Sequence, residues 1–171
     1  MHHFIILHCT SLLFLLTMGK STPPPVDKMK NNVKMLGETA LIRIQKFTNE
    51  FQISPNMVFS GAELIPNITL ETPLGLSSVA ENLNTFQLIL LNLTLDGTLQ
   101  IRSDIVGLLD IVHWLAASSS CPMKKPASDG HLETFLKTNM PFQLSIANIV
   151  LTRLQEFLNK LINNLDQLKK C

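Results

Sequence analysis

Residues 144–168 read LSIANIVLTRLQEFLNKLINNLDQL, and apolar residues recur there every three or four positions. An α-helix has 3.6 residues per turn, so this spacing returns side chains to one helix face. The stretch therefore predicts a long amphipathic helix with one buried stripe. The stripe consists of Leu144, Ala147, Leu151, Leu154, Leu158, Leu161, Leu165 and Leu168.

Three earlier segments carry the same periodicity, and no long segment alternates as a β-strand would. The predicted helices, A to D in chain order, cover residues 27–50, 74–95, 98–119 and 142–168. The stripes of A, B and C are Met29, Val33, Leu36, Ala40, Ile44, Phe47 and Phe51; then Leu76, Val79, Leu83, Phe86, Leu90 and Leu93; then Ile101, Ile105, Leu108, Val112 and Leu115. Turn-forming Pro and Gly separate them, as at Asp96-Gly97 between B and C.

The lengths of the connections predict the topology. The A–B connection (52–73) and the C–D connection (119–141) are long enough to travel the height of a bundle, whereas the B–C turn is short. Helices A and B therefore run parallel, C and D run parallel, and B and C run antiparallel. We predict an all-α, up-up-down-down long-chain four-helix bundle, the arrangement of growth-hormone-like cytokines with two crossover loops. An apolar piece at residues 131–140 predicts a short extra helix in the C–D connection.

Composition excludes several classes of protein. Lys and Arg number 14 against 13 Asp and Glu, which lacks the basic excess of a nucleic-acid binder. With 46% apolar and 16% charged residues, the chain is also unlike a disordered protein. Its 171 residues suffice for one domain with a sizeable core.

The N-terminus predicts export from the cell. Apolar residues 4–7 and 12–16 precede small residues at 17, 19 and 21, as in a signal peptide covering residues 1–20, with its boundary within about three residues. The alternative is a short membrane anchor, although the stretch is too short to span a bilayer. The four-helix domain would then occupy residues 21–171 and be secreted, without inserting into membranes.

The cysteines agree with an oxidising compartment. Cys9 would leave with the signal peptide, so Cys121 and Cys171 remain to form one disulfide. Helices C and D run in the same direction, so both cysteines reach the same pole of the predicted bundle. A disulfide between them would close a loop of about 50 residues and stabilise the fold by roughly 4 kcal/mol in the chain-entropy model. Asn67 and Asn92 begin possible N-glycosylation tripeptides.

Residues that carry out chemistry are scarce. After removal of the signal peptide only His113 and His131 remain, with no spacing typical of a zinc site. Asp110 lies one helical turn before His113, but without an activated nucleophile the pair is best interpreted as structural. We therefore expect no catalytic residues, no metal and no cofactor. The chain is predicted not to be an enzyme.

Four stretches resemble the leptin family. Residues 101–121, IRSDIVGLLDIVHWLAASSSC, match the leptin helix-C pattern Leu-x-Asp-x-x-His-x-Leu-Ala, followed by Ser and the first disulfide cysteine. Residues 153–155 and the terminal Cys171 match the end of leptin helix D. Residues 61–66, GAELIP, resemble Gly-Leu-Asp-Phe-Ile-Pro of the leptin A–B loop, and residues 28–43 align more loosely. The differences predict a divergent leptin from a non-mammalian, fish-like vertebrate.

The resemblance implies a hormone that binds a class I cytokine receptor, the leptin receptor, through its ectodomain and regulates energy balance and feeding. The hormone would be a monomer when free. The implied receptor-binding face on helices A and C comprises Asn32, Met35, Glu38, Thr39, Arg43, Gln100, Gly107, Asp110 and Ile111. Thr39, Arg43, Gln100 and Asp110 keep the leptin residue. Glu38 replaces a lysine and Gly107 an asparagine.

A second implied surface activates the receptor. It comprises Ala62, Glu63, Leu64, Ile65 and, at the start of helix D, Ser145. Ala62 replaces a leucine and Leu64 a phenylalanine, so the apolar anchor is reduced. Two alternatives remain: another long-chain helical cytokine with a different receptor, or a secreted amphipathic bundle that carries lipid.

Overall fold

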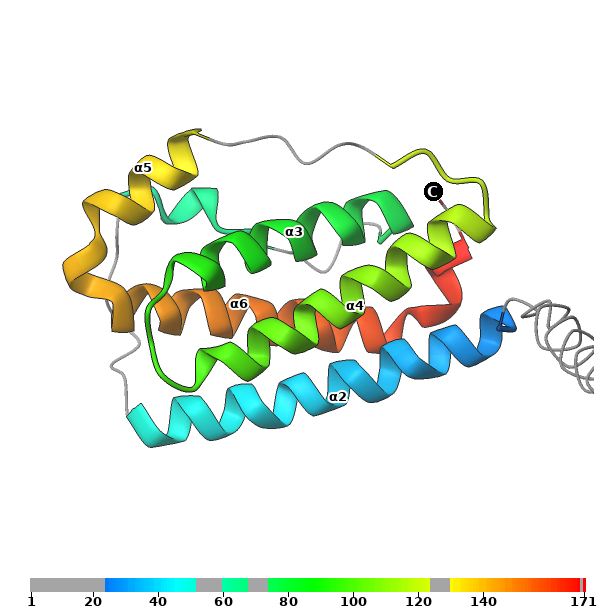
Figure 1. Cartoon of the computed structure of the whole chain (residues 1–171), viewed down its shortest axis with the longest axis horizontal. Coiled ribbons are helices and arrows are strands. Elements are labelled where there is room, and N and C mark those ends of the chain that lie inside the picture. Colours follow the sequence, from blue (N-terminus) through cyan, green and yellow to red (C-terminus); the bar gives the residue numbers. More distant parts are fainter. Residues whose placement is uncertain (1–23, 52–59, 68–73, 124–129, 170) are drawn as a thin grey trace, which may run out of the picture.

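The computed structural model describes residues 24–51, 60–67, 74–123, 130–169 and 171, and the regular secondary structure within them is all helical (Figure 1). The elements are α2 (Val26–Phe51), η1 (Ala62–Leu64), α3 (Leu76–Asn92), α4 (Thr98–Ser118), α5 (Gly130–Thr138), η2 (Met140–Phe142), α6 (Gln143–Asn163) and η3 (Leu165–Lys169), where η denotes a 3-10 helix. The predicted signal peptide, residues 1–20, lies outside the described residues.

The four long helices run up-up-down-down. In Figure 1, α2 and α3 both run from right to left, and α4 and α6 both return from left to right. Helices α2 and α3 each pack against α4 and α6. The predicted fold class is confirmed.

The last predicted helix ends earlier than expected. The predicted range was 142–168, whereas α6 ends at Asn163 and the chain continues as the 3-10 helix η3. The backbone N–H of Asn164 bonds to the carbonyl of Leu161, three residues back, and this tighter bond is how an α-helix commonly ends. Leu168 is nevertheless buried, so the apolar stripe outlasts the α-helix.

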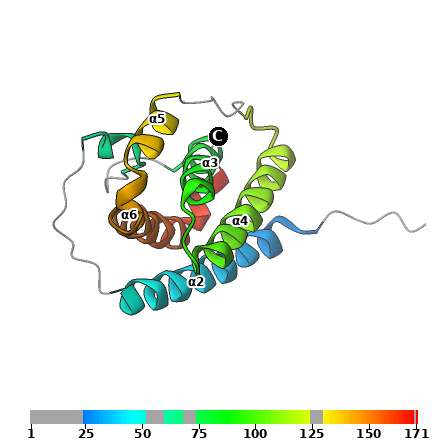
Figure 2. The ribbon, with the colours of Figure 1, turned by 60° about the vertical axis from the view of Figure 1, so that its left-hand side comes forward.

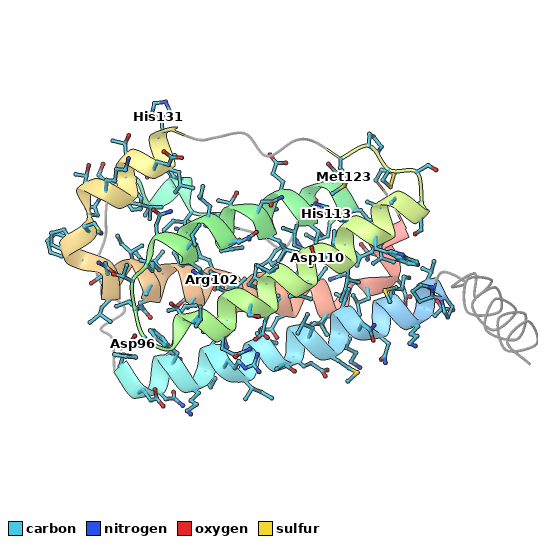
Figure 3. All side chains as sticks on the ribbon, viewed as in Figure 1. Asp96, Arg102, Asp110, His113, Met123 and His131 are labelled. Atoms are coloured by element: carbon cyan, nitrogen blue, oxygen red, sulfur yellow. A yellow bond between two sulfur atoms is a disulfide. The ribbon has the colours of Figure 1, made fainter. Side chains whose placement is uncertain are left out.

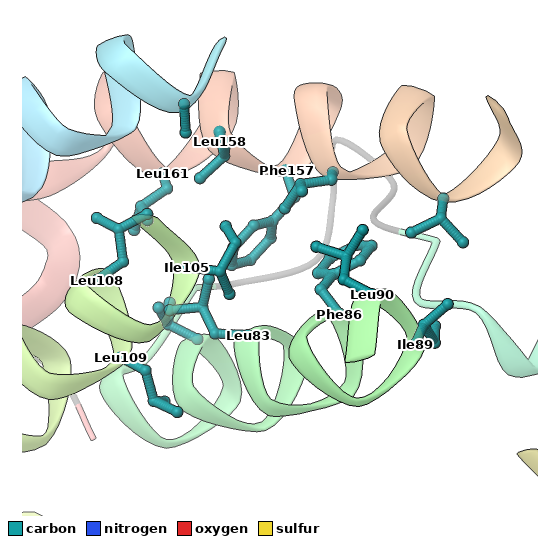
Figure 4. Close-up of a cluster of buried hydrophobic side chains, with 14 of the residues drawn as sticks. Leu83, Phe86, Ile89, Leu90, Ile105, Leu108, Leu109, Phe157, Leu158 and Leu161 are labelled. Carbon is teal, nitrogen blue, oxygen red and sulfur yellow. The ribbon is translucent and has the colours of Figure 1, made fainter. Parts of the chain in front are cut away.

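The core lies between the four long helices (Figure 4). Phe86 of α3 and Phe157 of α6 are fully buried, with ring centroids 5.7 Å apart. Ile105 and Leu108 complete this layer from α4, and Ile44 is fully buried on α2. Burying an aliphatic or aromatic side chain contributes about 1.5–3 kcal/mol, so such layers supply the main stabilisation of the bundle.

Two residues of the predicted buried stripes are exposed. Leu144 is 43% exposed and Phe51 is 41% exposed, so both predictions were wrong. Leu144 lies in the first turn of α6, at the end of its apolar stripe. Phe51 is the last residue of α2, and its ring stacks on Phe47 with centroids 4.5 Å apart. Both residues lie at the pole occupied by the B–C turn (Figure 1).

A disulfide closes the opposite pole. Cys121 and Cys171 are bonded, with Cα atoms 5.3 Å apart and a sequence separation of 50. The bond joins the end of α4 to the C-terminus beyond η3. The predicted pairing and its place are therefore confirmed.

The short helix α5 lies beside η1 (Figure 2). It was predicted at residues 131–140 and spans Gly130–Thr138, with Leu132, Phe135 and Leu136 buried. Gly61, which precedes η1, has φ +96°, and a Cβ built on it would collide with the ring of Phe135. Glycine permits both this left-handed conformation and the close approach of the ring.

Candidate functional site

The first implied surface lies across α2 and α4. The nine residues all lie on these two adjacent helices, and none is buried. Met35 is the most exposed large apolar residue among them, at 59%. The hydroxyl of Thr39 donates a hydrogen bond of 2.8 Å to the carbonyl of Met35, so part of its bonding capacity is used within the helix.

Arg43 has a structural partner that the sequence analysis missed. Its Nη1 donates to Oδ1 of Asp104 on α4, forming an ion pair between the two helices. The Asp104 side chain is 6% exposed and that of Arg43 is 36% exposed. Among the described residues, no hydrogen-bond partner occurs for Oδ2 of Asp104. Arg43 therefore neutralises a buried carboxylate while part of its side chain remains exposed.

Gly107 marks a close approach of α4 to α2. A Cβ built at this position would lie 2.9 Å from Cδ2 of Leu36. A glycine inside a helix costs about 1 kcal/mol relative to alanine, so its presence there requires a reason. The packing of Leu36 over Gly107 supplies that reason.

Ile42 extends the apolar part of this surface. It is 71% exposed on α2, next to Arg43 in sequence, and was not among the predicted site residues. Ile42 lies off the buried stripe of α2, which runs through Val33, Ala40 and Ile44. An isoleucine outside the stripe of an amphipathic helix was the signal that could have identified it.

The second implied surface is held in place by Arg153 of α6. Nη1 of Arg153 donates to the carbonyl oxygens of Ala62 and Ile65, at 2.6 Å and 2.7 Å. Ile65 is fully buried, so it supports the segment and presents no surface to a partner. The exposed side chain of this segment is that of Glu63, whose Oε2 accepts a hydrogen bond from the backbone N–H of Gly61 at 3.1 Å.

Ser145 lies in the first turn of α6 and is partly exposed. It lies at the same pole as η1 (Figures 1 and 2). The possible glycosylation residues Asn67 and Asn92 are both exposed. Asn92 ends α3, and its side-chain amide donates to the carbonyl of Leu88 at 2.9 Å.

Among the described residues, His113 and His131 belong to no group of possible metal ligands. Figure 3 labels Asp110 and His113 on α4 and His131 on α5, and all three are exposed. Within the described part of the chain, no three His, Cys, Asp or Glu residues are grouped as metal ligands. No helix there is long and apolar enough to cross a bilayer. The described surface can bind a partner through its shape, its charges and its exposed apolar residues.

A bundle with this topology, two long crossovers and a disulfide at one pole defines the class of long-chain helical cytokines. The leptin family model matches residues 25–171. Leptin of Sminthopsis crassicaudata is 28% identical over 96% of this chain and all of its own length. Leptins of Canis lupus familiaris and Mus musculus are each 31% identical, over 86% of this chain and 87% of their own. The chain belongs to the leptin family, as a divergent member.

Membership confirms the resemblance found in the sequence. The family consists of hormones of the cytokine type and not of enzymes, which agrees with the predicted lack of catalytic activity.

Proposed function

We propose that the protein is a secreted hormone that binds and activates a leptin receptor, a class I cytokine receptor, and so regulates energy balance and feeding. The observation that carries the proposal is the surface across α2 and α4. Four residues there keep the leptin identity: Thr39, Arg43, Gln100 and Asp110. They come from two packed helices, and each is exposed or partly exposed.

In this proposal the surface across α2 and α4 provides affinity for the receptor. Apolar Met35 and Ile42 are exposed on α2, as is charged Glu38, and Arg43 is partly exposed beside them. Interfaces commonly combine a few apolar or arginine anchors with a polar rim. Arg43 is fixed by Asp104, which lowers the entropic cost of ordering its side chain on binding.

The segment of η1 and the start of α6 would make a second receptor contact, required for activation. This contact is formed by Ala62, Glu63, Leu64 and Ser145, while Ile65 and Arg153 hold the segment in place. With two separate contact surfaces, one hormone can bring two receptor ectodomains together.

The test uses the full chain, expressed through a secretory pathway with its disulfide intact. Receptor-associated tyrosine kinase phosphorylation is measured in cells that carry a leptin receptor from a closely matched species and in the same cells without it. A dose-dependent response only in receptor-bearing cells is expected. No response in either would overturn the leptin-receptor proposal and direct the search to other class I receptors.

Export and modification are part of the proposal. Sequencing the N-terminus of the secreted protein should locate cleavage near residue 20. Treatment with an N-glycosidase should lower the apparent mass if Asn67 or Asn92 carries a glycan. Light scattering of the free hormone should give the mass of a monomer.

A further inference from the structure

The tripeptide Asn92-Leu93-Thr94 has the sequence to which an N-glycan is attached. In the structure Asn92 is the last residue of α3, and it is exposed. Leu93 follows with φ −86° and ψ 112°, an extended conformation, so the helix has ended where the tripeptide continues. The asparagine side chain therefore lies at a helix end that is open to solvent.

The side-chain amide of Asn92 can carry a sugar without losing its hydrogen bond. Its Nδ2 donates to the carbonyl of Leu88 at 2.9 Å. A primary amide nitrogen has two hydrogens, and attachment of a glycan replaces one of them. The other hydrogen remains for the bond to Leu88. A glycan at Asn92 is therefore compatible with the last turn of α3.

The hydroxyl of Thr94, the third residue of the tripeptide, is engaged only once the bundle has formed. This hydroxyl and the backbone N–H of Thr94 both donate to Oε1 of Gln143, at 3.0 Å. Gln143 lies 49 residues further along the chain, so it is synthesised after the tripeptide. The hydroxyl required for glycosylation is thus free of this contact while the chain is being made.

The same contact links the tripeptide to the second receptor contact proposed above. Gln143 is the first residue of α6, and Ser145 lies two residues beyond it. Thr94 and Ser145 line one open depression of about 450 Å³. Figure 1 shows the end of α3 at the pole where α6 begins. Because a glycan is bulky, one attached to Asn92 would stand beside this contact.

We propose that Asn92 carries an N-glycan in the secreted hormone, and that this glycan restricts the access of the receptor to the second contact. The inference rests on the proposed secretion and receptor function. It adds a means of regulation, because hormone that carries the glycan binds the receptor but activates it less than hormone without it. Binding persists because the surface across α2 and α4 lies on other helices.

The attachment itself is a transfer of an oligosaccharide from a lipid diphosphate donor. A bond forms between Nδ2 of Asn92 and the first carbon of the first sugar. The bond from that carbon to the diphosphate oxygen breaks, the lipid diphosphate leaves, and Nδ2 loses one proton.

The first measurement locates the glycan. The full chain is secreted from cells that add only high-mannose glycans, and glycopeptides of the purified hormone are mapped by mass spectrometry. A glycan on Asn92 is expected. An endoglycosidase that leaves one N-acetylglucosamine then removes the bulk of the glycan without changing the sequence or charge of the protein. Trimmed and untrimmed hormone thus differ in the glycan alone.

The second measurement compares activation with binding. It uses the variant Asn67→Gln, which removes the other tripeptide, so that trimming changes the glycan of Asn92 alone. Residues 68 and 69 of that other tripeptide lie outside the described part of the chain. Binding to the immobilised receptor ectodomain, signalling in receptor-bearing cells and the thermal unfolding midpoint are measured for untrimmed and trimmed Asn67→Gln and for Asn67→Gln/Asn92→Gln.

The trimmed form and the double variant should reach half-maximal signalling at about threefold less hormone than the untrimmed form, with affinities for the ectodomain within about twofold. The double variant keeps a side-chain amide at position 92 but cannot be glycosylated. If it unfolds, the comparison of trimmed with untrimmed Asn67→Gln decides alone.

Three results would overturn the inference. A secreted wild type without a glycan on Asn92 would refute the site, whatever the receptor does. Unchanged signalling after trimming would leave the glycan without a regulatory role. Equal changes of binding and signalling would mean that the glycan acts on receptor affinity and not on the second contact. Hormone that gives no response in either form would instead refute the proposed receptor function, and the regulatory role with it, while a mapped glycan would stand.

Discussion

The two candidate surfaces are built in different ways. The surface across α2 and α4 lies on two long helices, whose backbones are held by their own hydrogen bonds and by the core. The pole combines short 3-10 helices and turns that single side chains fasten: Arg153 to η1, and Gln143 to the B–C turn. The first surface is therefore held rigid by secondary structure, whereas the second depends on a few long-range contacts.

The difference predicts different responses to mutation. On the helices, a substitution should act through the contact it removes or through the core. At the pole, a substitution of Arg153 or Gln143 should change receptor activation while receptor binding persists.

The variant Arg43→Met should destabilise the fold and weaken receptor binding. It leaves the Asp104 carboxylate, 6% exposed, without its cation. Removing one partner of a buried pair costs about 3–5 kcal/mol of folding free energy. Because Arg43 is partly exposed, we expect a loss at the lower end of this range, about 3 kcal/mol. Urea unfolding measures the free energy of unfolding, and receptor binding is measured on the folded fraction.

A second substitution separates the two roles of Arg43. The double variant Arg43→Met/Asp104→Leu replaces the pair by apolar residues and should recover most of the stability. Receptor affinity should remain low. Recovery of affinity along with stability would show that Arg43 acts only within the fold, and would remove it from the receptor-binding residues.

The variant Arg153→Met should uncouple activation from binding. It removes two hydrogen bonds from a charged donor to the carbonyls of Ala62 and Ile65, each worth about 1.5–3 kcal/mol locally. Hydrogen exchange of residues 61–66 should rise and signalling should fall, while receptor affinity changes little. Arg153→Lys is the charge-matched control and should restore part of the protection. Unchanged exchange at these residues would refute the fastening role.

The variant Gly61→Ala should have a smaller effect of the same kind. An added methyl group meets the Phe135 ring, and φ +96° is unfavourable for alanine. Such backbone strain costs about 1–3 kcal/mol, which local rearrangement of η1 and α5 would relieve. Signalling should fall more than the overall free energy of unfolding. Gly130→Ala, where nothing lies within 4 Å of the built Cβ, is the control and should signal normally.

The fold could be predicted from the sequence because helical periodicity and loop length are local properties. Ile105, Leu108 and Val112 repeat at helical spacing and are all fully buried. At helix ends periodicity predicts burial less well, because Leu144 and Phe51 continue an apolar stripe beyond the neighbouring residues that would cover them. Periodicity indicates which face of a helix is apolar, but not how far along the helix that face is covered.

The fastening contacts of the site could not be predicted in the same way. Arg153 and Ala62 are 91 residues apart, so their hydrogen bond depends on the packed bundle and not on local pattern. The Arg43–Asp104 pair, by contrast, has a signal in the sequence. Asp104 falls on the buried face of α4 between Ile101 and Leu108, and a carboxylate in an apolar stripe requires a partner.

The smallest expected effect is that of Gly107→Ala, in the surface across α2 and α4. The new methyl group would lie 2.9 Å from Cδ2 of Leu36, which is the tip of a flexible, partly buried side chain and can turn aside. Alanine also gains about 1 kcal/mol of helix propensity over glycine. The two effects oppose each other, so the free energy of unfolding should change by less than about 1 kcal/mol.

Gly107→Ala thus repeats the chemical change of Gly61→Ala on the other surface. Signalling and receptor affinity should both stay within about threefold of wild type, because a helix held by its own hydrogen bonds absorbs one methyl group. A loss of affinity above tenfold at unchanged stability would contradict this. It would mean that the receptor approaches the backbone of α4 at Gly107 closely, and that this surface, too, depends on a single position.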